Sequence, residues 1–450
     1  MGKYFGTDGI RGVANKGLTS LLSLKLGYAL GQYLNEKGLG KTVAIGTDTR
    51  LSGFMLKSAL SSGLCSMGVN VLDLDVITTP GVGFVTKNNS FVSLGVVISA
   101  SHNPYYDNGI KILSKDGNKL SDETETYIEN IMDNISPKFE SEDKIGIRID
   151  GSEYVHLYMD FLKNAVKIND EPLNLSGMTV ALDCAYGASS NIAKELFESL
   201  GAKAISFNHT PDGLNINRGC GSLHSEFIAK ATKEEGADLG CAFDGDADRV
   251  IMCDHEGNIV DGDKIMAIYA KERKESVGLP ADCVVGTVMS NLGLAKYLKA
   301  SGIKLHRSKV GDRYVAEDMI TLGAVVGGEK SGHIIFNEIA PVGDGMLTAL
   351  MVIKTILQSG NSLKELTKDV KEYPQLLVNV KVENKEGWEE NEEILKAKEK
   401  AEEELGDSGR LVLRASGTEN LIRVMAEGDN QDDVDRIVHT LADRIKEVLK

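Results

Sequence analysis

Short apolar runs alternate with amphipathic stretches along most of this chain. Three of the runs, GVVISA, DLGCAF and AVVGG, end directly in a polar or glycine-rich loop. The alternation predicts layers of strands and helices, so the expected fold class is α/β, built from three similar units. Ligands of open α/β sheets bind beyond the carboxyl ends of strands, and we therefore expect the binding site at these three loops.

Changes in this pattern divide the chain into four expected domains. The boundaries fall after a polar stretch that ends near residue 150, near residue 254 and near residues 372–374. The expected domains are residues 1–150, 151–253, 254–372 and 373–450. The second should begin with a helix over 154–165. In the last domain the pattern predicts a small α+β unit. Its expected elements are a strand over 375–382, a charged helix over 388–405, two strands around a turn at Gly417 and a helix from Asp432.

The composition is that of a folded globular protein. The 450 residues are 42% hydrophobic and 26% charged, which is enough apolar surface for a sizeable core. The net charge of −16 predicts repulsion from nucleic acid and from anionic lipid, so neither is expected as a partner. There is no secretory signal pattern, no run of the ~18 apolar residues that a membrane span needs, and no C-x-x-C pair. We therefore expect a cytoplasmic protein with reduced thiols.

Three carboxylates follow the second apolar run at alternate positions. Asp244, Asp246 and Asp248 would share one face of an extended segment, and small residues separate them. Like charges held together need a cation or protons among them, and carboxylate oxygens suit Mg²⁺. A polar turn without a ligand explains the same pattern. The adjacent Arg249 favours a phosphate site, because a guanidinium binds phosphate oxygens in a forked geometry.

Ser101 follows the first apolar run and precedes a His-Asn-Pro sequence. Its hydroxyl is expected at an exposed, rigid loop tip. No G-x-S-x-G sequence surrounds it, so acyl transfer is not indicated. Taken alone, Ser101 is an ordinary turn residue. Beside a metal held by three carboxylates it becomes a candidate phosphoryl carrier, because the metal would offset the roughly −1.5 to −2 charge of a phosphoserine.

The remaining candidates lie in other loops. Two arginines and two hydroxyls around a glycine turn near the end of the chain could form a phosphate nest, and the simpler alternative is a hairpin turn with surface arginines. Other loop side chains could contact sugar hydroxyls or add positive charge, although each alone would be a turn or surface residue. These candidates are Arg414, Ser416, Gly417, Thr418 and Arg423 for phosphate, Glu329, Ser331 and His333 for a sugar, and Arg11 and Lys111 for charge.

Six segments together resemble the α-D-phosphohexomutase superfamily, and most closely the bacterial phosphoglucosamine mutases. They are KYFGTDGIRG, VISASHNPYYDNGIK, AFDGDADRVIMCDHEGN, KVGDRYV, GEKSGH and RASGTENLIRVM. Each motif alone is weak, but their order and their spread over essentially the full chain are specific. The resemblance implies three α/β domains with mixed sheets and a smaller phosphate-binding α+β domain, all arranged around a central cleft.

The resemblance also implies an activity. The enzyme would be an intramolecular phosphotransferase that interconverts glucosamine 6-phosphate and glucosamine 1-phosphate, a precursor of cell-wall synthesis. Phosphorylated Ser101 would give its phosphoryl group to the free hydroxyl of the phosphosugar and form a hexosamine 1,6-bisphosphate. This bisphosphate would turn over in the cleft and return a phosphoryl group from its other end. Family members are often dimers, so a homodimer is expected.

Matching positions imply a role for each candidate residue. One Mg²⁺ would be held by the phosphoserine oxygen of Ser101 and by the three aspartates, Asp244, Asp246 and Asp248. The transferring group would be flanked by Arg249 and by Lys111, the latter a proton shuttle, and Arg11 would support the phosphoserine. The substrate would be bound through its hydroxyls by Glu329, Ser331 and His333, and through its non-reacting phosphate by Arg414, Ser416, Gly417, Thr418 and Arg423.

Two departures from the family pattern affect the sugar loop and the phosphate loop. Lys330 stands in GEKSGH where phosphoglucosamine mutases usually carry Gln or Asn and phosphomannomutases carry Met. RASGTEN replaces the usual RPSGTEP, and the loss of two prolines predicts a more flexible loop. Three alternatives stay open: a phosphomannomutase/phosphoglucomutase, an aspartyl phosphatase with Asp244 as its nucleophile, and a phosphosugar-binding module without activity.

Overall fold

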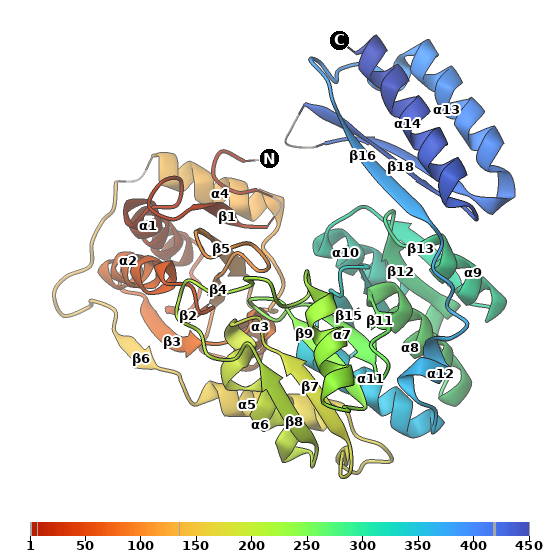
Figure 1. Ribbon diagram of the computed structural model, residues 1–450. Helices are drawn as coiled ribbons and strands as arrows, with labels where there is room; N and C mark the ends of the chain where they lie inside the picture. Colours follow the sequence, from red (N-terminus) through yellow and green to blue (C-terminus); the bar gives the residue numbers. More distant parts are fainter. Residues whose placement is uncertain (1, 7, 135, 417–419, 450) are drawn as a thin grey trace.

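The computed structural model describes residues 2–6, 8–134, 136–416 and 420–449. Four sheets follow one another along the chain and define four domains (Figure 1). Each of the first three sheets combines parallel strands with antiparallel pairs, whereas the fourth is wholly antiparallel. The expected fold class, three similar α/β units with mixed sheets and a smaller α+β unit, is confirmed.

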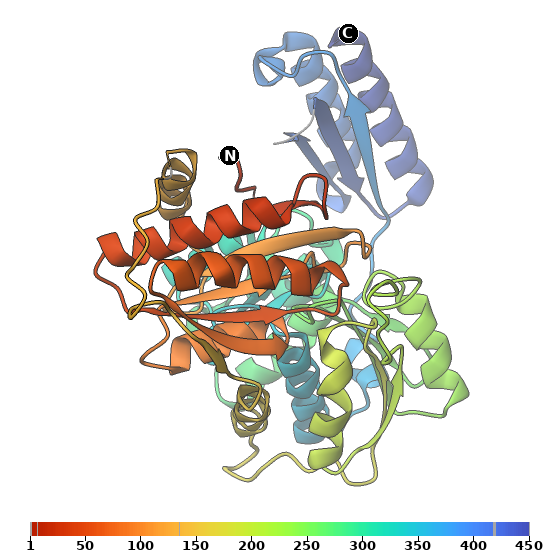
Figure 2. The ribbon, with the colours of Figure 1, turned by 90° about the vertical axis from the view of Figure 1, so that its left-hand side faces the viewer.

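The first domain contains β1 (Ile10–Val13), α1 (Ser20–Glu36), β2 (Thr42–Thr47), α2 (Ser52–Ser66), β3 (Asn70–Val76), α3 (Thr79–Asn88), β4 (Leu94–Ile98), β5 (Asp107–Leu113), α4 (Asp122–Asp133) and β6 (Arg148–Asp150). Its strand order is β1-β5-β4-β2-β3-β6. β2 and β4 are buried along their whole length, which explains why they are continuous apolar runs without alternation. α1 and α2 lie side by side against this sheet and share its core (Figure 2).

The second domain contains α5 (Tyr154–Ala165), β7 (Thr179–Asp183), a 3₁₀ turn (Ala188–Asn191), α6 (Ala193–Ser199), β8 (Lys203–Phe207), α7 (Ser225–Glu234), β9 (Leu239–Phe243), β10 (Val250–Asp254) and β11 (Ile259–Val260). Its strand order is β11-β10-β9-β7-β8. The helix expected over 154–165 is α5. Because β11 pairs with β10, this sheet continues past residue 254, and we propose the domain boundary after Val260.

The third domain contains α8 (Gly262–Ser276), a 3₁₀ turn (Pro280–Asp282), β12 (Cys283–Thr287), α9 (Leu292–Ala300), β13 (Lys304–Ser308), α10 (Asp312–Leu322), β14 (Val326–Gly328), β15 (Ile334–Phe336), α11 (Gly345–Ser359) and α12 (Leu363–Thr367). Its strand order is β13-β12-β14-β15. Side chains of the second and third domains share one apolar core, so these two domains are packed firmly together.

The C-terminal domain contains β16 (Gln375–Lys381), a 3₁₀ turn (Trp388–Glu390), α13 (Glu392–Leu405), a second 3₁₀ turn (Gly406–Ser408), β17 (Arg410–Ala415), β18 (Leu421–Glu427) and α14 (Gln431–Val448). Its strand order is β16-β18-β17, with a core of its own beneath α13 and α14. Figure 1 shows it standing apart from the first domain and joined to the third. Arg410 donates hydrogen bonds to the carbonyls of Val288 (2.9 Å) and Ser290 (3.0 Å), and Gln375 donates to Met289 (3.3 Å).

The three polar loops singled out in the sequence occupy equivalent places. Each joins an antiparallel pair of strands at the end of a buried strand: β4 to β5, β9 to β10, and β14 to β15. This repeat brings the three loops toward one central region. Among the described residues, no helix has both the length and the apolar character that crossing a bilayer requires.

Candidate active site

Ser101 lies in the loop between β4 and β5, and it is buried. The residue is only 1% exposed, so the exposed loop tip expected from the sequence is wrong: loops of the second domain cover it. Its φ of +52° is left-handed, a conformation that costs a non-glycine residue roughly 1–3 kcal/mol. The hydroxyl donates a 2.5 Å hydrogen bond to Oδ2 of Asp244. The serine of one domain therefore meets the acidic loop of the next.

The three aspartates of the β9–β10 loop converge as expected. One carboxylate oxygen from each of Asp244, Asp246 and Asp248 lies within 4.8 Å of the others, and all three side chains are buried. The extended geometry expected for this segment is wrong. Ala247 has a φ of +54° and its N–H donates to the carbonyl of Asp244, so a tight turn gathers the carboxylates. We name these three residues the acidic trio.

The electrostatics of the acidic trio suit a divalent cation. Burial raises the pKa of Asp244 far above its usual range, and the charges of Asp248 and Asp246 raise it further. Burial also opposes ionisation of Asp248, but His333 and Lys111 outweigh it and lower the pKa of that carboxyl. Oδ1 of Asp246 and Oδ1 of Asp248 are buried, and neither has a hydrogen-bond partner among the described residues. Oxygen ligands left unsatisfied at a shared point are what Mg²⁺ requires.

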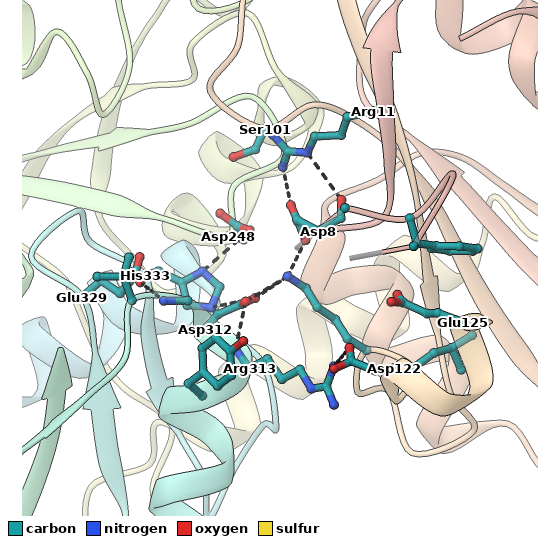
Figure 3. Close-up of a pocket in the computed structure, with 18 of the residues that line it drawn as sticks. Asp8, Arg11, Ser101, Asp122, Glu125, Asp248, Asp312, Arg313, Glu329 and His333 are labelled. Carbon is teal, nitrogen blue, oxygen red and sulfur yellow. Dashed lines mark hydrogen bonds and ion pairs between the residues drawn. The ribbon is translucent and has the colours of Figure 1, made fainter. Parts of the chain in front are cut away.

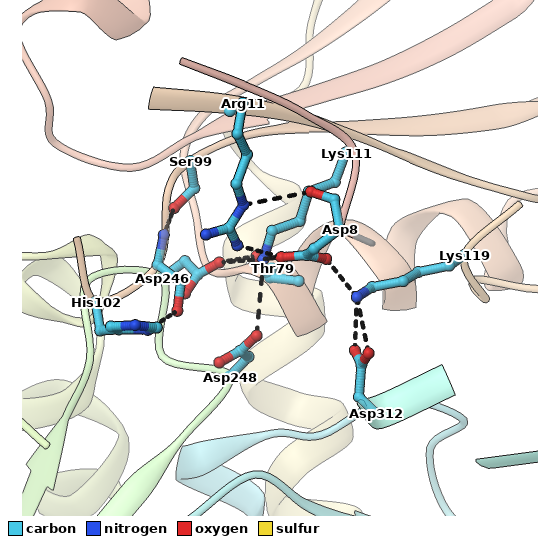
Figure 4. Close-up of polar contacts among 12 residues, drawn as sticks. Asp8, Arg11, Thr79, Ser99, His102, Lys111, Lys119, Asp246, Asp248 and Asp312 are labelled. Atoms are coloured by element: carbon cyan, nitrogen blue, oxygen red, sulfur yellow. Dashed lines mark hydrogen bonds and ion pairs between the residues drawn. The ribbon is translucent and has the colours of Figure 1, made fainter. Parts of the chain in front are cut away.

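Lys111 of β5 reaches the acidic trio from the first domain (Figure 4). Its ammonium lies 3.0 Å from Oδ2 of Asp246 and 3.4 Å from Oδ2 of Asp8, and Thr79 donates to the same Asp246 oxygen at 2.6 Å. Burial works against the charged amine, but the carboxylates of Asp246, Asp8 and Asp248 outweigh it and raise the pKa of Lys111. Lys111 is therefore held in its charged form: it can donate hydrogen bonds, but its raised pKa makes it a weak acid that gives up its proton with difficulty.

Asp8 and Asp312 extend this network beyond the residues that sequence analysis selected. Asp8 pairs with Arg11 and with Lys119, and Lys119 also reaches Oδ2 of Asp312 at 2.8 Å (Figures 3 and 4). Lys119 thereby links the first domain to the third. Asp8 and Asp312 belong to the motifs KYFGTDGIRG and KVGDRYV, so these motifs could have identified them as site residues.

Arg249 connects the acidic trio to the serine loop. Its backbone N–H donates to Oδ1 of Asp244 at 3.2 Å, and its guanidinium lies 3.0 Å from Nδ1 of His102. Since a guanidinium can only donate, Nδ1 of His102 is the acceptor and carries no proton. Burial and the charge of Arg249 lower the pKa of His102 to about 4, which agrees with a neutral ring.

The loop that was predicted to contact a sugar joins β14 to β15. Oε1 of Glu329 accepts from the N–H of Gly311 at 3.0 Å, and Ser331 donates to Oε2 of Glu329 at 3.2 Å. Nδ1 of His333 lies 3.6 Å from Oδ2 of Asp248. Lys330 points elsewhere: its ammonium lies 2.7 Å from Glu372, in the segment that leads to the C-terminal domain.

A cavity of about 690 Å³ opens among the first three domains (Figure 3). That size is typical of sites for small ligands. Its lining includes six of the predicted site residues, namely Ser101, Arg11, Asp248, Arg249, Glu329 and His333. The acidic trio contributes Asp248 to this lining, while Asp244 and Asp246 do not line it and contact Ser101 and Lys111, respectively. Three domains thus bring a hydroxyl, carboxylates and cations to one cavity.

The described C-terminal residues that were predicted to bind phosphate, Arg414, Ser416 and Arg423, do not line this cavity. Arg414 of β17 is opposite Arg423 of β18, and Ser416 is the first residue after β17. Burial and the neighbouring charge of Arg423 lower the pKa of Arg414, as expected for two guanidiniums on one face of a hairpin. Gly417 and Thr418 lie outside the described residues. No described residue of the C-terminal domain lines the cavity.

Family models match the chain in four consecutive pieces. They are phosphoglucomutase/phosphomannomutase alpha/beta/alpha domain I at residues 2–139, domain II at 156–257, domain III at 261–373 and the C-terminal domain at 377–444. The four models follow the same order as the four sheets, and the second ends just before β11.

Full-length relatives are similar over the entire chain. The phosphoglucosamine mutase of Geobacillus thermodenitrificans is 49% identical over 450 residues, and that of Bacillus subtilis is 47% identical over 454 residues. In both comparisons, 99% of this chain and 99% of the relative are covered.

Solved structures share the fold at lower identity. A phosphoglucomutase/phosphomannomutase family protein of Burkholderia thailandensis gives a TM-score of 0.82 at 22% identity, covering 99% of this chain and 97% of that one. N-acetylphosphoglucosamine mutase of Aspergillus fumigatus, solved in complex with GlcNAc-6P and magnesium, gives 0.69 at 17% identity, covering 99% and 96%. With four domain models in order and relatives of this identity over its full length, the chain belongs to the phosphoglucomutase/phosphomannomutase family and, within it, to the bacterial phosphoglucosamine mutases.

Proposed function

We propose that this enzyme, an isomerase, interconverts glucosamine 6-phosphate and glucosamine 1-phosphate through a phosphoserine at Ser101. One observation carries the proposal: the Ser101 hydroxyl lies 2.5 Å from a carboxylate of the acidic trio and lines the same cavity as Arg11 and Arg249. A phosphoryl group on that hydroxyl would find a cation site and two guanidiniums within one pocket. The activity named for the relatives from Geobacillus and Bacillus supports this assignment.

The acidic trio, with the phosphoserine oxygen of Ser101, would hold the metal ion. Carboxylates that are buried, close together and incompletely hydrogen-bonded fit Mg²⁺, which takes oxygen ligands and commonly shares them with phosphate. A bound Mg²⁺ supplies Lewis-acid stabilisation of the negative charge on a transferring phosphoryl group.

The protein residues then account for the rest of the transfer. The P–Oγ bond of phosphorylated Ser101 breaks, a P–O bond forms to the free sugar hydroxyl, and one proton passes overall from that hydroxyl to Oγ. Lys111, kept charged by its carboxylate neighbours, would stabilise the anionic group through its charge and hydrogen bonds, whereas its raised pKa opposes the role of proton shuttle that the resemblance implies. Arg11 and Arg249 would fix the phosphoryl oxygens. The hexosamine 1,6-bisphosphate made in this step would return a phosphoryl group from its other end after turning over.

Substrate binding would divide between the third and C-terminal domains. Glu329 and His333, which line the cavity, would bind the sugar hydroxyls together with Ser331, which donates to Glu329. The paired arginines Arg414 and Arg423, with Ser416, Gly417 and Thr418, would bind the phosphate that does not react. For that, the C-terminal domain has to approach the cavity. A homodimer and a cytoplasmic location stay predictions.

The hexose preference tests the proposal against a phosphomannomutase or phosphoglucomutase. Purified protein should convert glucosamine 6-phosphate with a kcat/KM at least about 10-fold above those for glucose and mannose phosphates. Lys330→Gln should leave this ranking unchanged, because the Lys330 ammonium is bound to Glu372 and does not line the cavity. Coupled assays of the three substrates, side by side, measure the ranking. A preference for mannose or glucose phosphate would assign the enzyme to the alternative class.

Arg423→Ala tests the role of the C-terminal domain. Loss of a charge-assisted hydrogen bond to phosphate should raise KM roughly 10-fold or more, since such bonds contribute about 1.5–3 kcal/mol. Arg436→Ala is the matched control, because Arg436 is exposed on α14 and pairs only with Glu404 and Asp433 among the described residues. An unchanged KM for Arg423→Ala in a folded protein would contradict the proposed phosphate site.

A further inference from the structure

Two side chains outside the cavity converge on the backbone of the serine loop. Arg50 Nη2 donates to the carbonyl oxygens of Ser101 at 3.1 Å and Asn103 at 2.5 Å. Asn217 Nδ2 donates to the same two oxygens at 2.8 and 3.0 Å. Two donors from different domains thus share two acceptors in one loop. The sequence motifs that identified the site include neither Arg50 nor Asn217.

The Arg50 guanidinium is itself held rigidly. Its side chain and that of its ion-pair partner Asp48 are both fully buried. Asp48 also accepts from the backbone N–H of Arg50 at 2.9 Å, and its own N–H donates to the carbonyl of Ile98 at the end of β4. A buried ion pair seldom stabilises a fold more than apolar side chains would. Its presence here therefore indicates that the position of the Arg50 guanidinium matters.

Asn217 brings the second domain to the same point. Its backbone is left-handed, with φ +58°, and its N–H donates to the carbonyl of Ala185 at 2.9 Å. Gly245 of the acidic-trio loop packs directly against this contact. A Cβ at Gly245 would lie 2.6 Å from the Ser101 carbonyl oxygen and 2.9 Å from Nδ2 of Asn217. The loops that carry Ser101, Gly245 and Asn217 are therefore closely packed against one another.

We propose that Arg50 and Asn217 are positioning residues that clamp the Ser101 carbonyl and so keep the Ser101 hydroxyl directed at the acidic trio. The left-handed backbone of Ser101 is unfavourable for a serine, and such a conformation persists only when surrounding contacts impose it. The clamp supplies those contacts on the carbonyl side, while the N–H of Ser101 donates to Ser99 Oγ at 2.9 Å. The inference rests on the proposed function, in which Ser101 carries the phosphoryl group.

The clamp should affect the chemical step and leave substrate binding unchanged. Neither Arg50 nor Asn217 lines the cavity. A reacting group displaced by about 1 Å can lose about 10²-fold in rate. Loosening the clamp should therefore lower kcat about 10- to 100-fold while KM stays within about two-fold. Phosphorylated Ser101 should also transfer more of its phosphoryl group to water, because it no longer faces the sugar hydroxyl in a fixed geometry.

Asn217→Asp is the most direct test, since aspartate keeps the shape and tolerates φ +58° but cannot donate to the two carbonyls. Asn217→Gly removes the amide without backbone strain and replaces the first variant if that one fails to fold. Asn215→Asp is the control: Asn215 lies in the same loop and donates to the Thr210 carbonyl, away from the serine loop. Steady-state kinetics, melting temperature and the water-to-sugar partition of labelled phosphoenzyme are measured for each.

The clamp is supported if both Asn217 variants lower kcat and raise the share of phosphoryl groups lost to water, while Asn215→Asp changes neither. It is overturned if a folded Asn217 variant keeps kcat within about two-fold of the unchanged protein, or if Asn215→Asp shows the same loss. Ser101→Ala, measured in the same assay, distinguishes failure of the proposed function from failure of the clamp alone. Activity retained by Ser101→Ala rejects the proposed function, whereas an inactive Ser101→Ala beside active Asn217 variants rejects only the clamp.

Discussion

Ser101→Ala is expected to reduce the interconversion of glucosamine phosphates by at least about 10⁴-fold, the scale of loss when an enzyme's nucleophile is removed. The variant has no oxygen to carry the phosphoryl group, and none of the groups around it can replace that oxygen. The fold should persist, because the lost side-chain hydrogen bond to Asp244 is one of several contacts of this loop. A coupled assay and intact-mass spectrometry check the result, since the added mass of one phosphate should map to Ser101 and disappear in the variant.

Ser62→Ala is the matched control, because Ser62 lies on the exposed face of α2 and donates only to the Ser58 carbonyl among the described residues. It should keep both activity and phosphate mass. Release of inorganic phosphate by Ser101→Ala at the rate of the unchanged protein would favour the aspartyl phosphatase alternative with Asp244 as nucleophile. Binding of glucosamine 6-phosphate without any conversion by the unchanged protein would favour a binding module.

Asp244→Asn is expected to lower activity about 10²- to 10⁴-fold and to weaken metal binding. The amide keeps the shape of the carboxylate but removes one charged ligand from the acidic trio and the charged acceptor of the Ser101 hydroxyl. Titration with Mn²⁺ followed by electron paramagnetic resonance reports binding independently of turnover. Removal of metal with EDTA should abolish activity, and added Mg²⁺ should restore it.

Asp160→Asn provides the comparison for this charge change, because Asp160 is exposed on α5 and pairs with Lys163. It should bind Mn²⁺ as the unchanged protein does. Full activity of the protein after metal removal, or unchanged Mn²⁺ binding by Asp244→Asn, would show that the acidic trio is not the metal site.

Local sequence pattern was sufficient to predict the loops of the site but not their shapes. The apolar runs before Ser101 and Asp244 are β4 and β9, and the acidic trio converges as expected. The trio does so through a turn with Ala247 at positive φ, which spacing alone cannot distinguish from an extended segment. Ser101 was expected to be exposed because the second domain that buries it is far away in sequence.

Contacts between domains account for most of what sequence analysis missed. Lys119 pairs with Asp312 of the third domain, and Asn217 of the second domain contacts the Ser101 loop, yet no periodicity links residues so far apart. The opposed pair Arg414 and Arg423 follows from a hairpin, which is a local structure. Its distance from the cavity depends on the orientation of a whole domain, which no local pattern encodes.

The hydrogen bonds of Arg410 and Gln375 to the carbonyls of residues 288–290 have a consequence for catalysis. They hold the C-terminal domain, which has a separate apolar core, to the third domain through polar groups. Water can replace such hydrogen bonds at little net cost in free energy, and the described residues of the two domains belong to separate apolar cores. In the proposed function the C-terminal domain would bring Arg414 and Arg423 to the substrate, and such polar contacts would let it rotate at a low cost in free energy.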